Sequence, residues 1–314
     1  MLTLQGLRGH PTRLRALTGL TEEQYDQLLA DLTPRYEAAE AVRLFRPNRQ
    51  RRRGAGRKFC RPLAERLLLV LVWLRVYPSY EVLGTLFEVD KGTVCHWLHP
   101  LLALLRQTTA VDLHWPAPEQ PKRDWGAVLR DFPEVAAIVD ATEQRTRRPK
   151  DPKGTPPTDQ GKAQRPYYSG KKKAHVLKTQ IAITPDGQIT EVSATVPGSV
   201  NDLTLLRQSG TLDRVLGGTM LDSGYQGIRK DRPHQLLYQA YRASRGHPLT
   251  PEQKGANRVL SHYRIEVEHT LAGMKIYQVL AAVYRHGRRA YNDVFCVVAA
   301  LTNRRRGFER TVAS

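Results

Sequence analysis

Apolar residues recur in two different patterns along this chain of 314 residues. In its first third, leucine, valine and aromatic residues fall at helical intervals of three and four, as in residues 21–32, 34–44 and 61–77. From about residue 125 onward, short β-rich runs are separated by turns that contain proline and glycine. The pattern predicts a helical N-terminal domain over residues 1–113 and an α/β domain over residues 125–314.

Two stretches without apolar periodicity interrupt these patterns. Residues 46–58 hold seven basic residues among thirteen, including Arg51, Arg52 and Arg53. Such a segment is either a solvated linker or an arm that lies on phosphates, and the charge of the chain favours the arm. Residues 114–124 contain three prolines, which predicts a linker between the two domains.

Two short helices joined by a tight turn are predicted between residues 80 and 106. Asp90 is placed to cap the second helix, whose inner face carries Val94 and Leu98. This arrangement is typical of a DNA-binding helix-turn-helix, although a plain helical hairpin has the same pattern. Pro100 is expected to end or kink the second helix. The outward positions of that helix, which are candidates for contact with DNA, are Lys91, Thr93, His96 and Trp97.

The α/β part opens with a strand that runs into an acid. Residues 135–139 are an uninterrupted run of small and β-branched apolar types, which is typical of a strand buried on both faces. The run ends at Asp140. A turn or helix-cap aspartate would explain this residue without a function, so its meaning depends on whether other acids meet it.

The segments that follow predict the order strand, hairpin, helix and strand. Residues 174–196 form the clearest hairpin, and a short helix with Asp202 near its start comes next. A further strand, residues 219–221, runs into Asp222 and a glycine turn. If the strand of residues 219–221 pairs beside the strand of residues 135–139, the sheet has the ribonuclease-H-like order. In this order Asp140 and Asp222 lie side by side at strand ends.

A helical run over residues 261–275 offers a third carboxylate. Glu266 and Glu268 are about 200° apart on a helix, so only one of them can face a shared site. Glu268 shares one stripe with Arg264 and Lys275 and is therefore the candidate. A polar stripe is also the usual solvent face of a helix, and an intrahelical ion pair would explain it without a function.

The charge of the chain is strongly unbalanced. Lys and Arg number 49 against 30 Asp and Glu, which gives a net charge of +19 and a pI near 10.1. This excess indicates a polyanionic partner and favours nucleic acid. Residues 145–173 carry much of it and predict either a mobile loop that settles on phosphates or a solvated insertion; Lys171, Lys172 and Lys173 are its candidate DNA contacts. Residues 304–306 are likewise expected to face phosphate or solvent.

Other classes of protein are disfavoured by what the sequence lacks. No apolar run reaches the length of a membrane span and no signal-peptide pattern opens the chain, so a soluble cytoplasmic protein is expected. Three widely spaced cysteines give neither zinc-ligand nor disulfide spacing.

Taken together, these blocks resemble the DDE transposases of bacterial insertion sequences, in particular the IS-five type and its Harbinger-like relatives. The blocks that carry the resemblance are the helix-turn-helix, residues 139–143, residues 197–202, residues 221–225, and Arg264 with Glu268 and Lys275. The last block resembles a Tyr-Arg-Glu-Lys signature, but Ser261 stands where the tyrosine is expected. No role is therefore assigned to a tyrosine at that place.

The resemblance implies a ribonuclease-H-like catalytic domain whose metal ligands are Asp140, Asp222 and Glu268. Three close carboxylates repel one another unless cations lie between them. Two Mg²⁺ ions, for which Mn²⁺ can substitute, are expected to serve phosphodiester hydrolysis and transesterification. Asp202 is the rival for the second ligand, although its place at a helix start already has a structural explanation.

The resemblance also implies double-stranded DNA as the partner, both the terminal repeats of the element and the target. Arg264 and Lys275 would contact DNA phosphates. Because two ends are cut, a homodimer or higher oligomer is expected on DNA, in a bacterial cytoplasm and associated with the nucleoid. The alternative is a domesticated or inactive DNA-binding protein derived from a transposase, and the presence of all three acids favours the enzyme.

Overall fold

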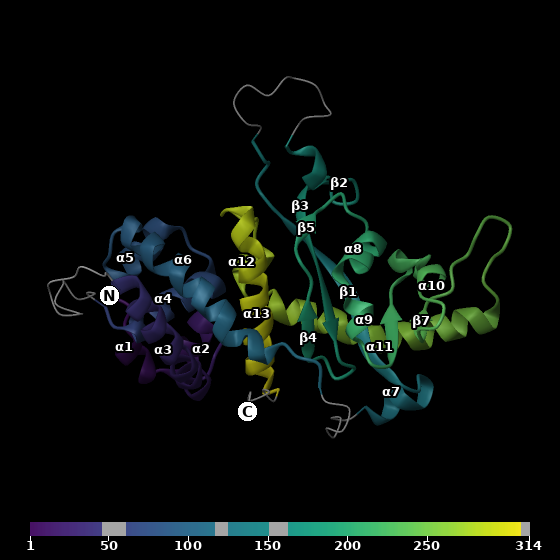
Figure 1. The fold of residues 1–314 in the computed structure, drawn as a ribbon, viewed down its shortest axis with the longest axis horizontal. Helices are drawn as coiled ribbons and strands as arrows, with labels where there is room; N and C mark the ends of the chain where they lie inside the picture. The colour runs from purple at the N-terminus through teal and green to yellow at the C-terminus, as the bar shows by residue number, and fades with distance from the viewer. Residues whose placement is uncertain (46–60, 117–124, 151–162, 309–314) are drawn as a thin grey trace. The chain divides into compact units, whose positions relative to one another are not determined.

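The computed structural model describes residues 1–45, 61–116, 125–150 and 163–308, and the chain forms two compact units (Figure 1). Unit 1 comprises Met1–Asp112, Ile276–Ala281 and Asp293–Ser314, and unit 2 comprises Leu113–Lys275 and Ala282–Asn292. The first boundary lies where the sequence places the end of the helical domain. Residues 276–281 and 293–314 belong to unit 1, whereas the sequence pattern predicted them as part of the α/β domain.

Unit 1 is built around one fully buried helix. Its helices are α1 (Leu4–Arg8), α2 (Pro11–Thr18), α3 (Glu22–Leu44), α4 (Leu63–Val76), α5 (Tyr80–Phe87), α6 (Lys91–Thr108), α12 (Gln278–Ala281) and most of α13 (Tyr291–Arg306). Helix α4 is buried on all sides from Arg66 to Leu74, as a helix that is apolar all round must be. The other helices from α1 to α6 and α12 pack on it. None of the described helices is both long and apolar enough to cross a bilayer.

Two prolines lie inside helices, one where a helix was predicted to start and one where a helix was predicted to end or kink. Pro34 is within α3, so residues 21–32 and 34–44 form one helix and not two. Pro100 is within α6, which continues to Thr108. Both proline rings are exposed, so the carbonyl that each leaves unbonded in the preceding turn can be hydrated. In α3 the Thr33 hydroxyl also donates to the carbonyl of Leu29 (2.7 Å).

The helix-turn-helix is present as α5 and α6. Ser79 caps α5 and Asp90 caps α6, as the sequence indicates. The chain between them turns through Glu88, whose φ of 52° is in the left-handed region, and the Val89 amide donates to the carbonyl of Gly84 (2.9 Å). The Val89 carbonyl in turn lies so close to Gly84 that an added Cβ would collide with it. Gly84 is therefore the residue that permits the tight turn.

Gly84→Ala is expected to destabilise unit 1 by about 1–3 kcal/mol, because the new methyl group overlaps a backbone carbonyl that cannot move without opening the turn. Urea unfolding followed by circular dichroism would measure the loss. Gly9→Ala is the matched control, since Gly9 has ordinary helical φ and nothing near its Cβ position. Equal stability of the two variants would contradict the role of Gly84.

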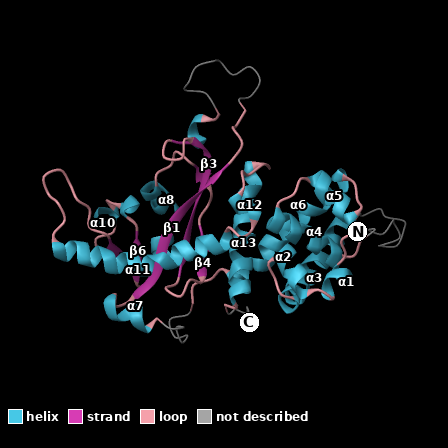
Figure 2. Cartoon of the chain, turned by 180° about the vertical axis from the view of Figure 1, so that it is seen from behind, coloured by secondary structure: helices cyan, strands magenta, loops and turns pink. Residues whose placement is uncertain are grey.

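Unit 2 contains a mixed sheet with helices on both faces (Figures 1 and 2). Its strands are β1 (Val135–Arg145), β2 (Tyr168–Ser169), β3 (Ala174–Ile183), β4 (Ile189–Val192), β5 (Val196–Pro197), β6 (Gly218–Leu221) and β7 (Leu237–Gln239). The strand order is β2-β3-β1-β6-β7, with β4 and β5 also paired to β3. β1 is antiparallel to β3 and parallel to β6. The predicted α/β class, with a mixed sheet preceded by a helical helix-turn-helix region, is confirmed.

The helices of unit 2 are α7 (Gly126–Asp131), α8 (Asp202–Ser209), α9 (Thr211–Arg214), α10 (Ile228–Asp231) and α11 (Pro251–Met274). Helices α8 and α9 lie on one face of the sheet and the long α11 crosses the other face, where it packs on β1. On the α8 face, Leu206, Tyr225 and Ile228 join Val139 and Leu221 in one buried cluster. This cluster holds the turn after β6 rigidly against the sheet.

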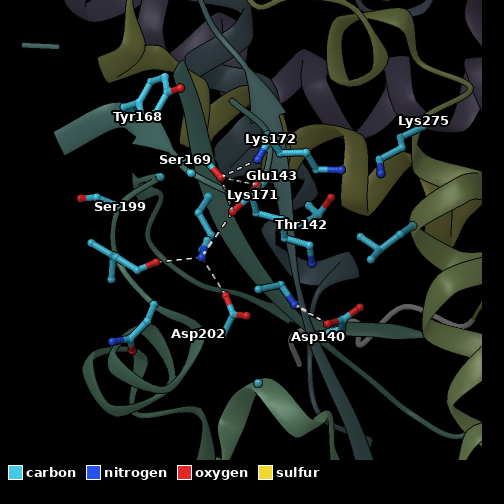
Figure 3. Close-up of a pocket in the computed structure, with 18 residues that line it drawn as sticks. Asp140, Thr142, Glu143, Tyr168, Ser169, Lys171, Lys172, Ser199, Asp202 and Lys275 are labelled. Atoms are coloured by element: carbon cyan, nitrogen blue, oxygen red, sulfur yellow. Dashed lines mark hydrogen bonds and ion pairs between the residues drawn. The ribbon is translucent and has the colours of Figure 1, made fainter. Parts of the chain in front are cut away.

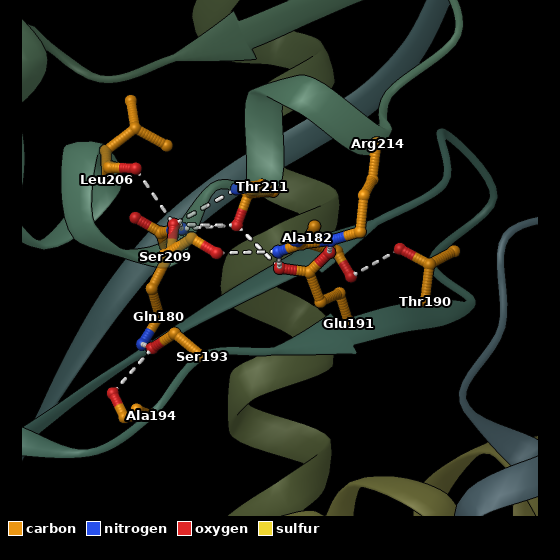
Figure 4. Close-up of polar contacts among 10 residues, drawn as sticks. All are labelled: Gln180, Ala182, Thr190, Glu191, Ser193, Ala194, Leu206, Ser209, Thr211 and Arg214. Atoms are coloured by element: carbon orange, nitrogen blue, oxygen red, sulfur yellow. Dashed lines mark hydrogen bonds and ion pairs between the residues drawn. The ribbon is translucent and has the colours of Figure 1, made fainter.

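A polar network on the same face ties the β3–β4 hairpin to α9 (Figure 4). Arg214 donates two hydrogen bonds of 2.7 Å to the carboxylate of Glu191, and the Thr211 hydroxyl donates a third. Gln180 donates to Thr211 from the neighbouring strand (3.1 Å). Burial opposes ionisation of Glu191, but the hydrogen bonds from Arg214 and Thr211 outweigh it and hold the pKa of this carboxyl below its usual value.

Candidate active site

The pairing of β1 with β6 brings the two predicted aspartates together. Val139 is paired with Leu221 in parallel register, so Asp140 and Asp222 follow at the same level on neighbouring strands. Asp222 stands where β6 ends, as predicted. Asp140 does not end its strand, because β1 continues to Arg145 in pairing with β3 after β6 has stopped. Asp140 therefore lies in the middle of β1, at the position where the pairing of β1 with β6 ends.

Asp140 is the more buried member of this pair, because its side chain is 23% exposed and that of Asp222 is 45% exposed. Burial raises the pKa of its carboxyl to about 6, and the carboxylates of Asp222 and Asp202 act in the same direction. The Arg264 guanidinium and the Ala141 amide, which donates to Asp140 Oδ1 (2.9 Å), oppose that shift. A buried carboxyl with a raised pKa beside further acids is the setting in which a bound cation relieves repulsion.

Arg264 of α11 lies between the two aspartates. Its Nη1 is 3.3 Å from Asp222 Oδ1, and its Nη2 is 4.0 Å from Asp140 Oδ1. The side chain is 14% exposed, so the guanidinium is largely withdrawn from solvent. Its contacts here are with these carboxylates, and the described residues contain no Arg264–Glu268 ion pair of the kind that the sequence left open.

Glu268 lies one helical turn beyond Arg264 and is exposed. Arg264, Glu268 and Lys275 fall within about 40° of one another around the helix, so the helical period allows Glu268 to face the site, but no described contact joins it to Asp140 or Asp222. No hydrogen bond or ion pair of its side chain occurs among the described residues. Glu266, the other glutamate considered, is half-buried on another face and approaches His269 at 4.0 Å.

Asp202, the rival second ligand, belongs to a different set of contacts (Figure 3). The buried ammonium of Lys178 donates to Asp202 Oδ1 (2.8 Å) and to the carbonyl of Val200 (2.7 Å), and it lies 3.5 Å from Glu143. Asp202 is nevertheless close to the turn that carries Asp222. Gly224 belongs to this turn, and a Cβ atom added to Gly224 would lie only 3.0 Å from Asp202 Oδ2. Asp202 is thus near Asp140 and Asp222 and neutralised by a lysine.

A polar cavity of about 610 Å³ opens beside Asp140. Asp140, Glu143 and Asp202 line one side of it, and the lysines that line it are Lys171, Lys172, Lys178 and Lys275 (Figure 3). Burial, followed by the nearby ammonium of Lys172, lowers the pKa of Lys275, while Asp140 opposes that shift. Lys172 and Lys275 thus repel each other electrostatically at this cavity, and an anion such as a DNA phosphate would relieve that repulsion.

The other predicted DNA contacts are placed as follows. Lys173, on the turn before β3, is exposed. Residues 163–173 contain the short strand β2, so this part of the predicted basic loop is ordered by pairing with β3. The loop's central residues 151–162, and Arg51, Arg52 and Arg53, lie outside the described residues.

The outward candidates on α6 differ in their exposure. Lys91 and His96 are exposed, and Lys91 is paired with Glu81 of α5. Thr93 is half-buried, and its hydroxyl donates to the capping carboxylate of Asp90 (2.7 Å). Trp97 was wrongly placed outward: it is 4% exposed, because the helix turns its wide apolar face to the core of unit 1.

Tyr225 is the site residue that sequence reasoning missed. Its ring is buried in the cluster beneath the Asp222 turn, and burial, followed by the carboxylates of Asp140 and Asp202, raises the pKa of its hydroxyl well above the usual value. The hydroxyl has no hydrogen-bond partner among the described residues. The sequence held one signal, a tyrosine three residues after the strand-end aspartate.

The donor set suits a hard divalent cation. All the acids that meet here offer oxygen atoms, which Mg²⁺ and Mn²⁺ prefer as ligands. The Asp140 carboxyl has a raised pKa and the Tyr225 hydroxyl has no hydrogen-bond partner among the described residues, so both groups would be stabilised by a bound ion. In the part of the chain that the structure describes, no three His, Cys, Asp or Glu side chains already form a metal cage. The chemistry of these residues therefore fits such an ion, while in this structure the guanidinium of Arg264 lies beside Asp140 and Asp222.

Comparison with known proteins agrees with this geometry. The profile of a family described as DDE superfamily endonuclease matches residues 139–303, and that of the helix-turn-helix of DDE superfamily endonuclease matches residues 62–110. A probable transposase for insertion sequence element IS702 from Microchaete diplosiphon is 26% identical over 83% of this chain and 87% of its own length. A putative transposase for insertion sequence element IS112 from Streptomyces albus G is 27% identical over 86% of each chain. No solved structure matches significantly.

The first profile covers more than half of the chain, and within it lie Asp140 of β1, Asp222 directly after β6, and Arg264 and Glu268 of α11. The second covers α4, α5 and α6, including the capped turn at Gly84. Together with the strand order and the paired aspartates, these matches show that the chain belongs to the DDE superfamily endonucleases and carries the helix-turn-helix of that superfamily ahead of its endonuclease domain.

Proposed function

We propose that this protein is a transposase that binds the terminal inverted repeats of an insertion sequence, cuts the DNA there and joins the cut ends to a target. The observation that carries the proposal is the pairing of Asp140 and Asp222 at one level of neighbouring strands, within a DDE superfamily endonuclease domain. The names of the two relatives, both transposases of insertion sequences, support it.

The proposed ligands of the divalent ions are Asp140, Asp222 and Glu268. Enzymes of the DDE superfamily generally use divalent ions, and we expect two Mg²⁺, with Mn²⁺ as a substitute. When bound, such ions activate the attacking oxygen and stabilise the leaving oxygen of a phosphodiester. The side chains of Lys172 and Lys275 would hold a phosphate of the same strand beside the acids, because both face the cavity that Asp140 lines.

In this proposal one predicted domain binds the DNA ends and the other cleaves and joins the DNA. Residues 1–113 bind the element ends through α6, with Lys91 and His96 as its exposed candidates, and the domain that begins at residue 125 carries the chemistry. The +19 charge of the chain supports duplex DNA as the partner for both domains. Because two ends must be cut, the assembled complex is expected to contain at least two copies of the chain.

The test is incubation of the protein with end-sequence DNA and Mg²⁺. Nicking at the element end and strand transfer to a second DNA are expected, and both should stop on chelation of the metal. Binding of end DNA without any nicking, in Mg²⁺ or Mn²⁺, would instead support an inactive DNA-binding derivative of a transposase.

The same assay separates the two candidates for the second ligand. Asp222→Asn is expected to abolish nicking and to leave binding of end DNA largely intact. Asp202→Asn is expected to retain nicking, because Lys178 already neutralises Asp202. The reverse result would assign the second ligand to Asp202.

A further inference from the structure

The hydroxyl of Tyr225 is a buried polar group without a hydrogen-bond partner among the described residues. The side chain is 1% exposed, so solvent cannot supply the missing partner. A buried hydroxyl that finds no partner destabilises the fold, and native structures hold few of them. That Tyr225 keeps a buried hydroxyl despite this cost indicates that its hydrogen-bond acceptor is present only when a ligand is bound.

The acids of the candidate site lie in the neighbourhood of this side chain. The ring packs against Val139 and Leu221, the residues that precede Asp140 and Asp222, and the carboxylates of Asp140, Asp202 and Asp222 act on the hydroxyl electrostatically without being hydrogen-bonded to it. Each carboxylate is engaged elsewhere: Asp202 accepts from Lys178, while Asp140 and Asp222 share Arg264. The phenol hydroxyl is hydrogen-bonded to none of them among the described residues, so its proton is available to a carboxylate that a bound ion reorients.

The position of the hydroxyl is fixed by the core. The ring packs in the cluster with Val139, Leu206 and Ile228, so it cannot turn away from the acids. The backbone of Tyr225 is held as well, because its amide donates to the carbonyl of Asp222 (3.1 Å) and its own carbonyl accepts from Gln239 (3.1 Å). The phenol is thus a preorganised donor on the same turn as Asp222.

We propose that Tyr225 is a positioning residue of the divalent-ion site. Its hydroxyl would donate a hydrogen bond to a carboxylate oxygen of Asp140 or Asp222 when these residues hold the ion. This inference rests on the proposed metal-dependent function and adds a residue that acts through the acids. Partners of this kind orient the ligands and strengthen binding of the ion.

The test is Tyr225→Phe, which removes one oxygen and keeps the ring in the core. Titration with Mn²⁺, followed by the electron paramagnetic resonance signal of the free ion, is expected to show an affinity about 10-fold or more below that of the parent protein. The Mn²⁺ concentration that gives half-maximal nicking is expected to rise by the same factor, with the affinity for end DNA unchanged. The melting temperature of the metal-free variant is expected to equal or exceed that of the parent.

Tyr277→Phe is the matched control. Tyr277 of unit 1 is also fully buried with a hydroxyl that lacks a partner among the described residues, but no carboxylate of the site acts on it. Its affinity for Mn²⁺ is expected to match that of the parent. Unchanged Mn²⁺ affinity in Tyr225→Phe, or a melting temperature lowered without metal, would overturn the role of Tyr225 and leave the proposed function standing. A parent protein that binds no Mn²⁺ would contradict the proposed function itself.

Discussion

Asp140→Asn is expected to abolish DNA cleavage while leaving the binding of end DNA largely intact. A metal-bound site supplies several kcal/mol of transition-state stabilisation, so loss of its central ligand lowers the rate by on the order of 1000-fold or more. Asp140 is the carboxylate that burial, Asp222 and Arg264 all act upon, which makes it the centre of the site. Nicking of end-sequence DNA in Mg²⁺, with a gel-shift assay for binding, would measure both effects.

The same substitution is expected to stabilise the metal-free protein at pH 7. The pKa of Asp140 is raised from 3.8 to about 6 on folding, so the folded state binds the proton more tightly than the unfolded state. The cost of ionising this carboxyl is therefore fully present above about pH 6 and disappears as the pH falls toward 3.8. Asp140→Asn removes that cost and flattens the profile of melting temperature against pH in this interval.

Asp213→Asn is the control for both effects, because Asp213 pairs with Arg232 on the surface of unit 2 and is far more exposed. It is expected to keep full cleavage and an unchanged pH profile. Cleavage by Asp140→Asn at the parent rate would remove this residue from the proposed ligands.

Arg304→Met is expected to destabilise unit 1 by about 3–5 kcal/mol, a loss of roughly 10 °C or more in melting temperature. The Arg304 guanidinium is buried at the end of α13, where its Nε lies 2.8 Å from Asp112 and its Nη1 lies 2.8 Å from Asp31. Asp112 is only 1% exposed, so removal of the arginine leaves a buried carboxylate without its cation. Calorimetry on the full chain would measure the shift.

A double variant tests whether this loss comes from the ion pair. Arg304→Met combined with Asp112→Asn is expected to be less destabilised than the sum of the two single changes, because neutralising Asp112 removes the buried charge that the first change exposes. Strictly additive losses would show that packing, and not charge, explains the effect of Arg304.

Most of the secondary structure could be predicted from the sequence because its signals are local. The alternation of β-branched residues, the turn after residue 184 and the capping residues Ser79 and Asp90 each act within a few positions. Prolines were the exception. Their effect depends on whether the unbonded carbonyl meets water, and at Pro34 and Pro100 the exposed helix surface allows the helix to continue.

The sequence by itself determined the α/β class behind a helix-turn-helix and the pairing of the strands that lead to Asp140 and Asp222, because the apolar period and the length of each connection restrict how a sheet can be ordered. It did not determine that residues 276–281 and 293–314 belong to unit 1, or that β2 and β7 join the sheet. Only the tertiary structure decided which partner each polar side chain has. Arg264 lies between two aspartates, Arg304 is buried in an ion-pair network, and the buried hydroxyl of Tyr225 has no hydrogen-bond partner among the described residues. These pairings join residues up to about 270 positions apart, and no local pattern records them, because burial and charge compensation exist only once distant segments have packed together.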